Sequence, residues 1–194
     1  MNTKPYVVLV GMDFSELADR ALWQAFELAT RRERAEVHVL CVIPSASPGA
    51  QQALTGYCLI AEAGVRDGAF ESLRAHVQAE LDAFISRAAR FSPARAPDQV
   101  VSHVRVGTEA AGIVELAAAI SADLIVLGAH GHRGSSHSLT LGSVAENTVR
   151  HAACPVLVIP AEKRASERIG NSERPWSART VTPCSATHRP SVRP

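Results

Sequence analysis

The chain has 194 residues, of which 46% are hydrophobic and 20% are charged, and its formal net charge at pH 7 is +1. This length and apolar content are typical of one domain with a substantial core. Basic residues are in excess after residue 160, whereas residues 1–160 are slightly acidic. The composition therefore predicts a folded domain over residues 1–160 that lacks the basic surface of a nucleic-acid-binding protein.

The N-terminus and the cysteines indicate the compartment. No charged region followed by a hydrophobic stretch opens the chain, and no apolar run is long enough to cross a membrane. The four cysteines show neither a C-x-x-C pair nor the spacing of a zinc site. We therefore expect a soluble, cytoplasmic protein with reduced thiols and no membrane association.

Short apolar runs alternate with helical periodicity in the first half of the chain. The runs at 6–10 and 37–43 predict strands, and Pro44 ends the second. His38 within it is more typical of a buried structural residue than of a ligand. The first strand leads through a turn into a helix whose apolar face is Ala18, Ala21, Leu22, Ala25, Leu28 and Ala29.

Glycines and prolines then predict a loop insertion over residues 44–68, with a short helical piece within 51–61. A long helix follows, and its apolar stripe indicates core packing. The members of this stripe are Phe70, Leu73, Val77, Leu81, Phe84, Ile85 and Ala88.

The second half repeats the alternation. A strand is predicted over residues 100–106, and Thr108 is expected to cap the helix that follows. The inner face of that helix is expected to consist of Ile113, Leu116, Ala117 and Ile120. A buried strand at 124–127 precedes a glycine loop. A final helix is expected from the stripe Val144, Ala145, Thr148, Val149 and Ala152.

Residues 155–160 form a last apolar strand bracketed by prolines, which places it at an edge of the sheet. An apolar edge favours a partner, so we hypothesise an isologous dimer through this strand. From residue 161 to 194, Ser, Arg and Pro dominate without periodicity, which predicts a disordered tail. That tail is either a plain linker or a binding segment for an acidic partner.

Five strands alternating with four helices predict an α/β fold, an open parallel sheet with right-handed crossovers and helices on both faces. In such sheets ligands bind in a crevice at the carboxyl ends of the strands. Asp13 and the glycine loop both follow strands and are expected at that edge. Asp13 has two interpretations: a ligand contact, or a helix N-cap in a capping box with Glu16.

The loop from 128 to 143 contains Gly128, Gly131, Gly134 and Gly142. Glycines let backbone N–H groups approach an anion, and the start of the next helix adds its own free N–H groups and dipole. The loop is neither a Walker loop nor a G-x-G-x-x-G turn. It either binds phosphate or is purely structural, and Ser143, in a capping box with Glu146, serves the cap or a phosphate.

The histidines at 130, 132 and 137 suggest a metal site, but no nearby cysteine or carboxylate completes a ligand set. Contact of His130 or His132 with phosphate is the better interpretation. Arg133 is the sole arginine of the loop, and no base or water-orienting residue is evident. Slow hydrolysis is compatible with this pattern, whereas it does not support dedicated catalysis.

Residues 6–160, about four-fifths of the chain, resemble the universal stress protein family. The motifs are Val-Gly-Met-Asp-Phe-Ser at 10–15, Ala-Asp-Leu-Ile-Val-Leu-Gly-Ala-His-Gly at 122–131, Leu-Gly-Ser-Val-Ala-Glu at 141–146 and His-Ala-Ala-Cys-Pro-Val-Leu-Val-Ile-Pro at 151–160. The resemblance implies a Rossmann-like sheet of order 3-2-1-4-5, a homodimer through the last strand, and ATP binding by the loop. This loop, Gly128-x2-Gly131-x10-Gly142-Ser143, is one residue longer than the family pattern. The extra residue either bulges outward or misplaces one amide.

The resemblance also implies roles for individual residues. Asp13 holds the adenine or ribose side, Val42 contacts adenine through its backbone, and Met12 and Leu127 wall the base. The phosphates, bridged by Mg²⁺, face Gly128, Gly131, Gly142, Ser143 and Val144. The expected function is that of an ATP-binding regulatory protein of the stress response with an unidentified protein partner. The alternative is a dimeric stress-related interaction protein that binds no nucleotide.

Overall fold

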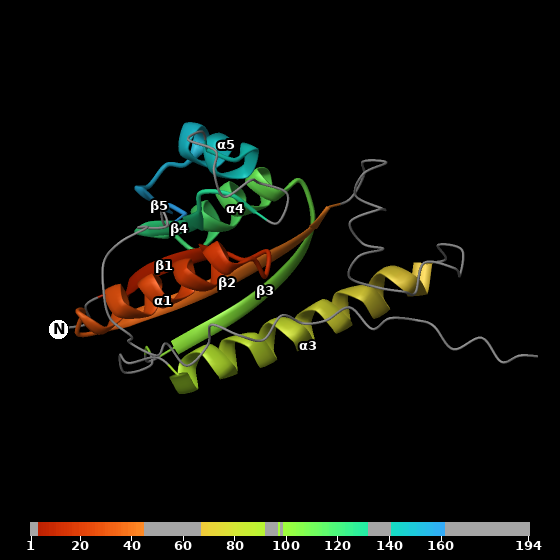
Figure 1. Ribbon diagram of the computed structural model, residues 1–194, viewed down its shortest axis with the longest axis horizontal. Coiled ribbons are helices and arrows are strands. Elements are labelled where there is room, and N and C mark those ends of the chain that lie inside the picture. The colour runs from red at the N-terminus through yellow and green to blue at the C-terminus, as the bar shows by residue number, and fades with distance from the viewer. Residues whose placement is uncertain (1–3, 45–66, 92–96, 98, 132–140, 162–194) are drawn as a thin grey trace, which may run out of the picture. The chain divides into compact units, whose positions relative to one another are not determined.

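The computed structural model describes residues 4–44, 67–91, 97, 99–131 and 141–161, without the side chains of 67–70. The expected insertion at 45–66, the middle of the glycine loop and the tail from 162 lie outside these residues. Figure 1 shows the helices and strands. They are β1 (Tyr6–Gly11), α1 (Glu16–Thr30), β2 (Ala35–Pro44), α3 (Asp67–Phe91), β3 (Gln99–Gly107), α4 (Glu109–Ala119), β4 (Leu124–Gly128), α5 (Ser143–His151) and β5 (Val156–Ile159).

The five strands form one parallel sheet of order β3-β2-β1-β4-β5. This confirms the predicted fold class and strand order. The first four strands extend slightly beyond their apolar runs because backbone pairing continues past the residues that need burial. β5 is shorter than expected: it begins after Pro155 and ends before Pro160, because proline cannot donate a backbone hydrogen bond to a sheet.

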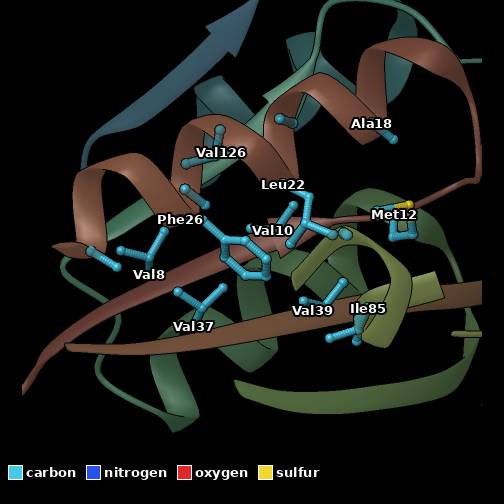
Figure 2. Packing of buried hydrophobic residues seen from close by; sticks show 14 of the residues in the cluster. Val8, Val10, Met12, Ala18, Leu22, Phe26, Val37, Val39, Ile85 and Val126 are labelled. Atoms are coloured by element: carbon cyan, nitrogen blue, oxygen red, sulfur yellow. The ribbon is translucent and has the colours of Figure 1, made fainter. Parts of the chain in front are cut away.

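Two apolar layers cover the two faces of the sheet. α1 and α3 pack on one face, and α4 and α5 on the other. Figure 2 shows Phe26 of α1 projecting toward Val8 and Val37 of the sheet. Phe26 is fully buried, and burial of such a side chain contributes about 1.5–3 kcal/mol. The first layer therefore depends strongly on this residue.

Two predicted helix faces need correction. In α1 the predicted face omitted Phe26, which is fully buried, and included Leu28, which is only half-buried. In α5 the predicted Val149 is 47% exposed, while Ala145 and Thr148 are buried. The buried stripe of α1 is thus rotated toward Phe26, while α5 buries a narrower stripe than its apolar content suggests.

No helix in the described ranges is both long and apolar enough to span a membrane. Cys41 is buried and Cys154 half-buried, and both are free thiols. The other two cysteines, Cys58 and Cys184, lie outside the described residues.

Candidate functional site

The turn after β1 carries the predicted carboxylate. Asp13 Oδ1 accepts a hydrogen bond from the backbone N–H of Ser15 at 3.0 Å. Ser15 Oγ in turn accepts from the N–H of Ala18 at 3.2 Å and caps α1. The proposed capping box of Asp13 and Glu16 is therefore wrong: Ser15 is the N-cap, and Asp13 fixes the turn that precedes it.

Phe14 in this turn has a φ of 60°, the left-handed region that bulky residues rarely occupy. Its ring packs edge-to-face against Phe84 of α3, with the centroids 5.8 Å apart. Such backbone strain persists only where the surroundings enforce it, and it gathers at functional sites. The strained turn holds Asp13 at the carboxyl edge of the sheet.

Gly131 lies directly against Asp13. A Cβ at position 131 would overlap Asp13 Oδ2, so a larger residue there would make the Asp13 side chain shift. Asp13 thus uses one carboxylate oxygen for the turn and presents the other to the glycine loop. The structure thereby brings together two residues that are 118 positions apart in the chain and were both predicted at the site.

The two ends of the glycine loop meet at its base. The N–H of Gly142 donates to the carbonyl of Ala129 at 2.8 Å, and the N–H of Ala129 donates to the carbonyl of Ile159 at 2.8 Å. A Cβ at Gly142 would stand 3.1 Å from the carbonyl oxygen of Ala129, a tight approach. The loop therefore leaves the end of β4 and returns beside it, at the start of α5.

The start of α5 differs from the prediction. Gly142 occupies the N-cap position and makes no side-chain cap hydrogen bond, while Ser143 is the first helical residue. The predicted capping box of Ser143 and Glu146 is wrong, because Glu146 Oε1 accepts from Arg150 at 2.7 Å instead. The N-cap residue of α5 thus provides no side-chain cap to the first-turn N–H groups, and Ser143 is exposed. Such a helix start suits an anion.

Val42 lies where β2 runs past β1. Pairing between these strands ends at Gly11 and Leu40, and the N–H of Met12 donates to the carbonyl of Leu40 at 2.8 Å. Backbone groups of alternate strand residues point to the same side. Those of Val42 therefore point toward β1 just beyond its last residue, which suits the predicted backbone contact.

Other predicted residues lie deeper. Met12 and Leu127 are each 4% exposed and belong to the apolar layers on opposite faces of the sheet, so the structure does not bring their side chains together. The side chain of Val144 packs into the apolar layer under α4 and α5. Only its backbone could therefore contact a ligand. Gly128 and His130 lie at the loop base, where His130 Nδ1 is buried.

Asp13 places a carboxylate at the carboxyl edge of the sheet. The pKa of the nearby Cys41 thiol is raised to about 12, first by burial and then by the Asp13 carboxylate. Cys41 therefore stays protonated at neutral pH. Among the described residues no three His, Cys, Asp or Glu side chains gather to hold a metal ion, and His132, His137 and Arg133 lie outside them.

Two features of the site escaped sequence reasoning. Ser15 lies in the predicted turn after the first strand, and Asp-x-Ser before a helical stripe is typical of a side-chain-stabilised turn followed by a cap. Gly11 is the other: a Cβ there would overlap the Leu127 side chain, so glycine lets β1 and β4 end side by side. No local signal reveals that contact.

Comparison with known proteins agrees with this architecture. A family model described as "Universal stress protein family" matches residues 7–160. Universal stress protein G of Salmonella typhimurium is 31% identical over 157 residues, which cover 80% of this chain and 98% of that protein. A match to a universal stress protein of Methanocaldococcus jannaschii is 48% identical over 58 residues, and it spans 30% of this chain and 34% of that protein.

Solved structures show the same fold. UspA from Lactobacillus plantarum, a universal stress protein, superposes with a TM-score of 0.59 at 26% identity, covering 81% of this chain and 99% of that one. A universal stress protein in complex with cAMP superposes with a TM-score of 0.50 at 22% identity, covering 82% of this chain and 100% of that one. The latter likeness is one of fold alone.

The open parallel sheet, with a carboxylate and a glycine loop at the carboxyl ends of its strands, defines a doubly wound α/β domain. Together with the family match over residues 7–160, it identifies the chain as a member of the universal stress protein family.

Proposed function

We propose that the protein binds ATP with Mg²⁺ in the crevice at the carboxyl ends of β1, β2 and β4. Asp13 holds the ribose or adenine side and the backbone of Val42 contacts the base. Gly128, Gly131, Gly142, Ser143 and Val144 face the phosphates, with His130 beside them. Occupancy biases the loop from 128 to 143 toward one of two arrangements and so regulates a partner protein.

The observation that carries the proposal is the closed base of the loop. The 2.8 Å hydrogen bond from Gly142 to Ala129 holds the uncapped start of α5 beside the end of β4. Gly131 lies on the same edge against Asp13. The start of α5 thus lies where it could face a phosphate chain, with the Asp13 carboxylate beside Gly131 on the same edge. A neighbour of this fold holds the adenine nucleotide cAMP.

The role of the protein is binding rather than catalysis. Mg²⁺ would be bound chiefly by the phosphate oxygens, since this ion keeps several waters and needs few protein ligands. Its charge would offset that of the phosphates beside Asp13. Because the sequence of the loop shows no evident base or water-orienting residue, we expect at most slow hydrolysis.

The first test is identification by mass of nucleotide extracted from freshly purified protein, followed by calorimetric titration with Mg²⁺-ATP. We expect bound ATP and saturable binding. Asp13→Ala should weaken binding about tenfold, which corresponds to about 1.4 kcal/mol. The control is Glu71→Ala, which removes an exposed carboxylate from α3 and should leave affinity unchanged.

Absence of both copurified nucleotide and titratable affinity would contradict the proposal. It would favour the other reading, a stress-related interaction protein that binds no nucleotide. Equal affinity of the Asp13→Ala variant and the parent would instead contradict the assignment of Asp13.

A homodimer through β5 is the second part of the proposal. β5 is an edge strand with four half-buried aliphatic residues, paired to β4 along one side. Pairing with the β5 of a second copy would satisfy its other side and cover apolar surface.

A further inference from the structure

The face of the sheet that α4 covers carries two histidines near its β3 edge. His38 of β2 is 9% exposed, and its Nδ1 lies 2.9 Å from Nε2 of His103 on β3. The ring planes are 12° apart and the centroids 5.1 Å apart. Because the two nitrogens are much closer than the centroids, the rings meet edge to edge. The contact is therefore an in-plane hydrogen bond between imidazoles.

Such a contact needs one proton between the two nitrogens. It forms when both imidazoles are neutral, since one nitrogen donates and the other accepts. It also forms when the pair carries one extra proton. When both rings are charged, however, an N–H points from each nitrogen at the other, and the hydrogen bond is lost.

Charged groups from each packed element surround the pair. Glu36 of β2 places Oε2 3.6 Å from Nε2 of His38, which favours a proton on that outer nitrogen. Arg105 of β3 lies beside His103, and its guanidinium is 4.0 Å from the carboxylate of Glu115 on α4. The pKa of His103 is lowered, mainly by burial and then by His38 and Arg105. The surroundings of His103 thus disfavour its charged form.

We propose that the hydrogen-bonded pair His38–His103 is an acid-sensitive latch that fastens the edge strand β3 to β2 and opens when both imidazoles are protonated. β3 stands at the edge of the five-stranded sheet, so in the described part of the chain β2 is its strand neighbour. β3 also leads through Thr108 into α4. Opening the latch loosens β3 and the start of α4 without disturbing β1, β4 or β5.

The sign of the pH effect follows from the direction of the shift. The pKa of His103 in the folded protein lies below the ordinary value of 6.5. Between these two values the unfolded chain binds more protons than the folded one. The contribution to stability is therefore present above pH 6.5 and is lost as the pH falls through the folded pKa.

Two measurements on the full chain test the latch. An NMR titration of the imidazole protons should show coupled behaviour, with two steps shared by His38 and His103 and the second step below 6.5. Hydrogen exchange read by mass spectrometry, corrected for intrinsic rates, should show protection of β3 amides falling at least threefold from pH 7.5 to pH 5.5. In His103→Gln this pH-dependent loss should disappear, whereas His151→Gln at the end of α5 should retain it.

Independent titration of both rings near 6.5 would overturn the proposal. So would an acid-dependent loss of protection in His103→Gln equal to that of the parent. If His103→Gln does not fold, as judged by circular dichroism, the titration of the parent protein decides alone. Both readouts are independent of nucleotide binding, so failure of the proposed ATP site leaves this test intact.

Discussion

Asp13 connects the turn after β1 to the glycine loop through its two carboxylate oxygens. One accepts from the backbone of Ser15, and the other lies against Gly131. The carboxylate is thus positioned from both sides before any ligand arrives. Positioning of this kind reduces the ordering that a ligand would otherwise have to impose.

The contact between Asp13 and Gly131 predicts a specific non-additivity. Gly131→Ala places a methyl group against the Asp13 carboxylate and should lower the free energy of unfolding of nucleotide-free protein by about 1 kcal/mol or more. In the Asp13→Ala background the obstacle is absent, so the same substitution should cost less than about 0.5 kcal/mol. Urea denaturation of the four proteins in this cycle measures the difference.

Equal costs of Gly131→Ala in the two backgrounds would mean that the close approach does not constrain the loop. The control for general loop effects is Leu141→Ala, because Leu141 is 43% exposed beside the far end of the loop. That substitution should cost the same with or without Asp13.

The chemistry at individual residues was predictable from sequence to a limited degree. Strand ends followed by an aspartate or by glycines indicate the ligand edge of a parallel sheet, and Asp13 and Gly131 do meet there. Sequence spacing does not show which atom a glycine makes room for, because that atom belongs to a distant segment. The same limit applies to Met12 and Leu127, whose burial in opposite layers depends on the twist and packing of the whole sheet.

At the scale of the helices and strands, periodicity predicted each element and left their ends uncertain. α1 shows why: Asp13, Ser15 and Glu16 all favour a helix start, and side-chain hydrogen bonds select Ser15. At α5 the capping pattern was present at Ser143, yet the chain turns into the helix one residue earlier, at Gly142. The backbone hydrogen bond of Gly142 to Ala129, a tertiary contact, outweighs the local pattern there.

The helix caps give a prediction at this scale. Ser15→Ala removes the acceptor for the Ala18 N–H and should lower the free energy of unfolding by about 1 kcal/mol. Thr108 holds the corresponding position in α4 but makes no side-chain cap hydrogen bond. Thr108→Ala should therefore change the free energy of unfolding by less than about 0.5 kcal/mol. Chemical denaturation of both variants beside the parent makes the comparison. A larger loss for Thr108→Ala than for Ser15→Ala would contradict this account of the caps.

For the whole molecule, alternation of strands and helices was enough to predict a parallel sheet. The order of its strands was implied by the family resemblance rather than by periodicity. That order leaves two edges, β3 and β5, which differ in chemistry. β3 carries Ser102, whose hydroxyl bonds Gln78 and Asp82 of α3, and it also carries the histidine contact. β5 is aliphatic throughout, so β5 is the better edge for pairing with a second copy.

Dimerisation through β5 can be tested without disturbing the sheet, because the direction of its backbone groups is known. The carbonyl of Pro155 accepts from Ile125 of β4, and that of Ile159 accepts from Ala129 just after β4. The backbone groups of odd-numbered residues therefore face β4, and Val158 presents its N–H to the free edge. Val158→Pro removes that donor, which an edge position tolerates.

We expect a dimer of the parent protein in sedimentation equilibrium and a folded monomer of the Val158→Pro variant. Leu157→Pro, which removes a donor toward β4, should instead lower the melting temperature. A parent monomer at all concentrations, or a Val158→Pro variant that remains dimeric, would show that β5 does not pair two copies.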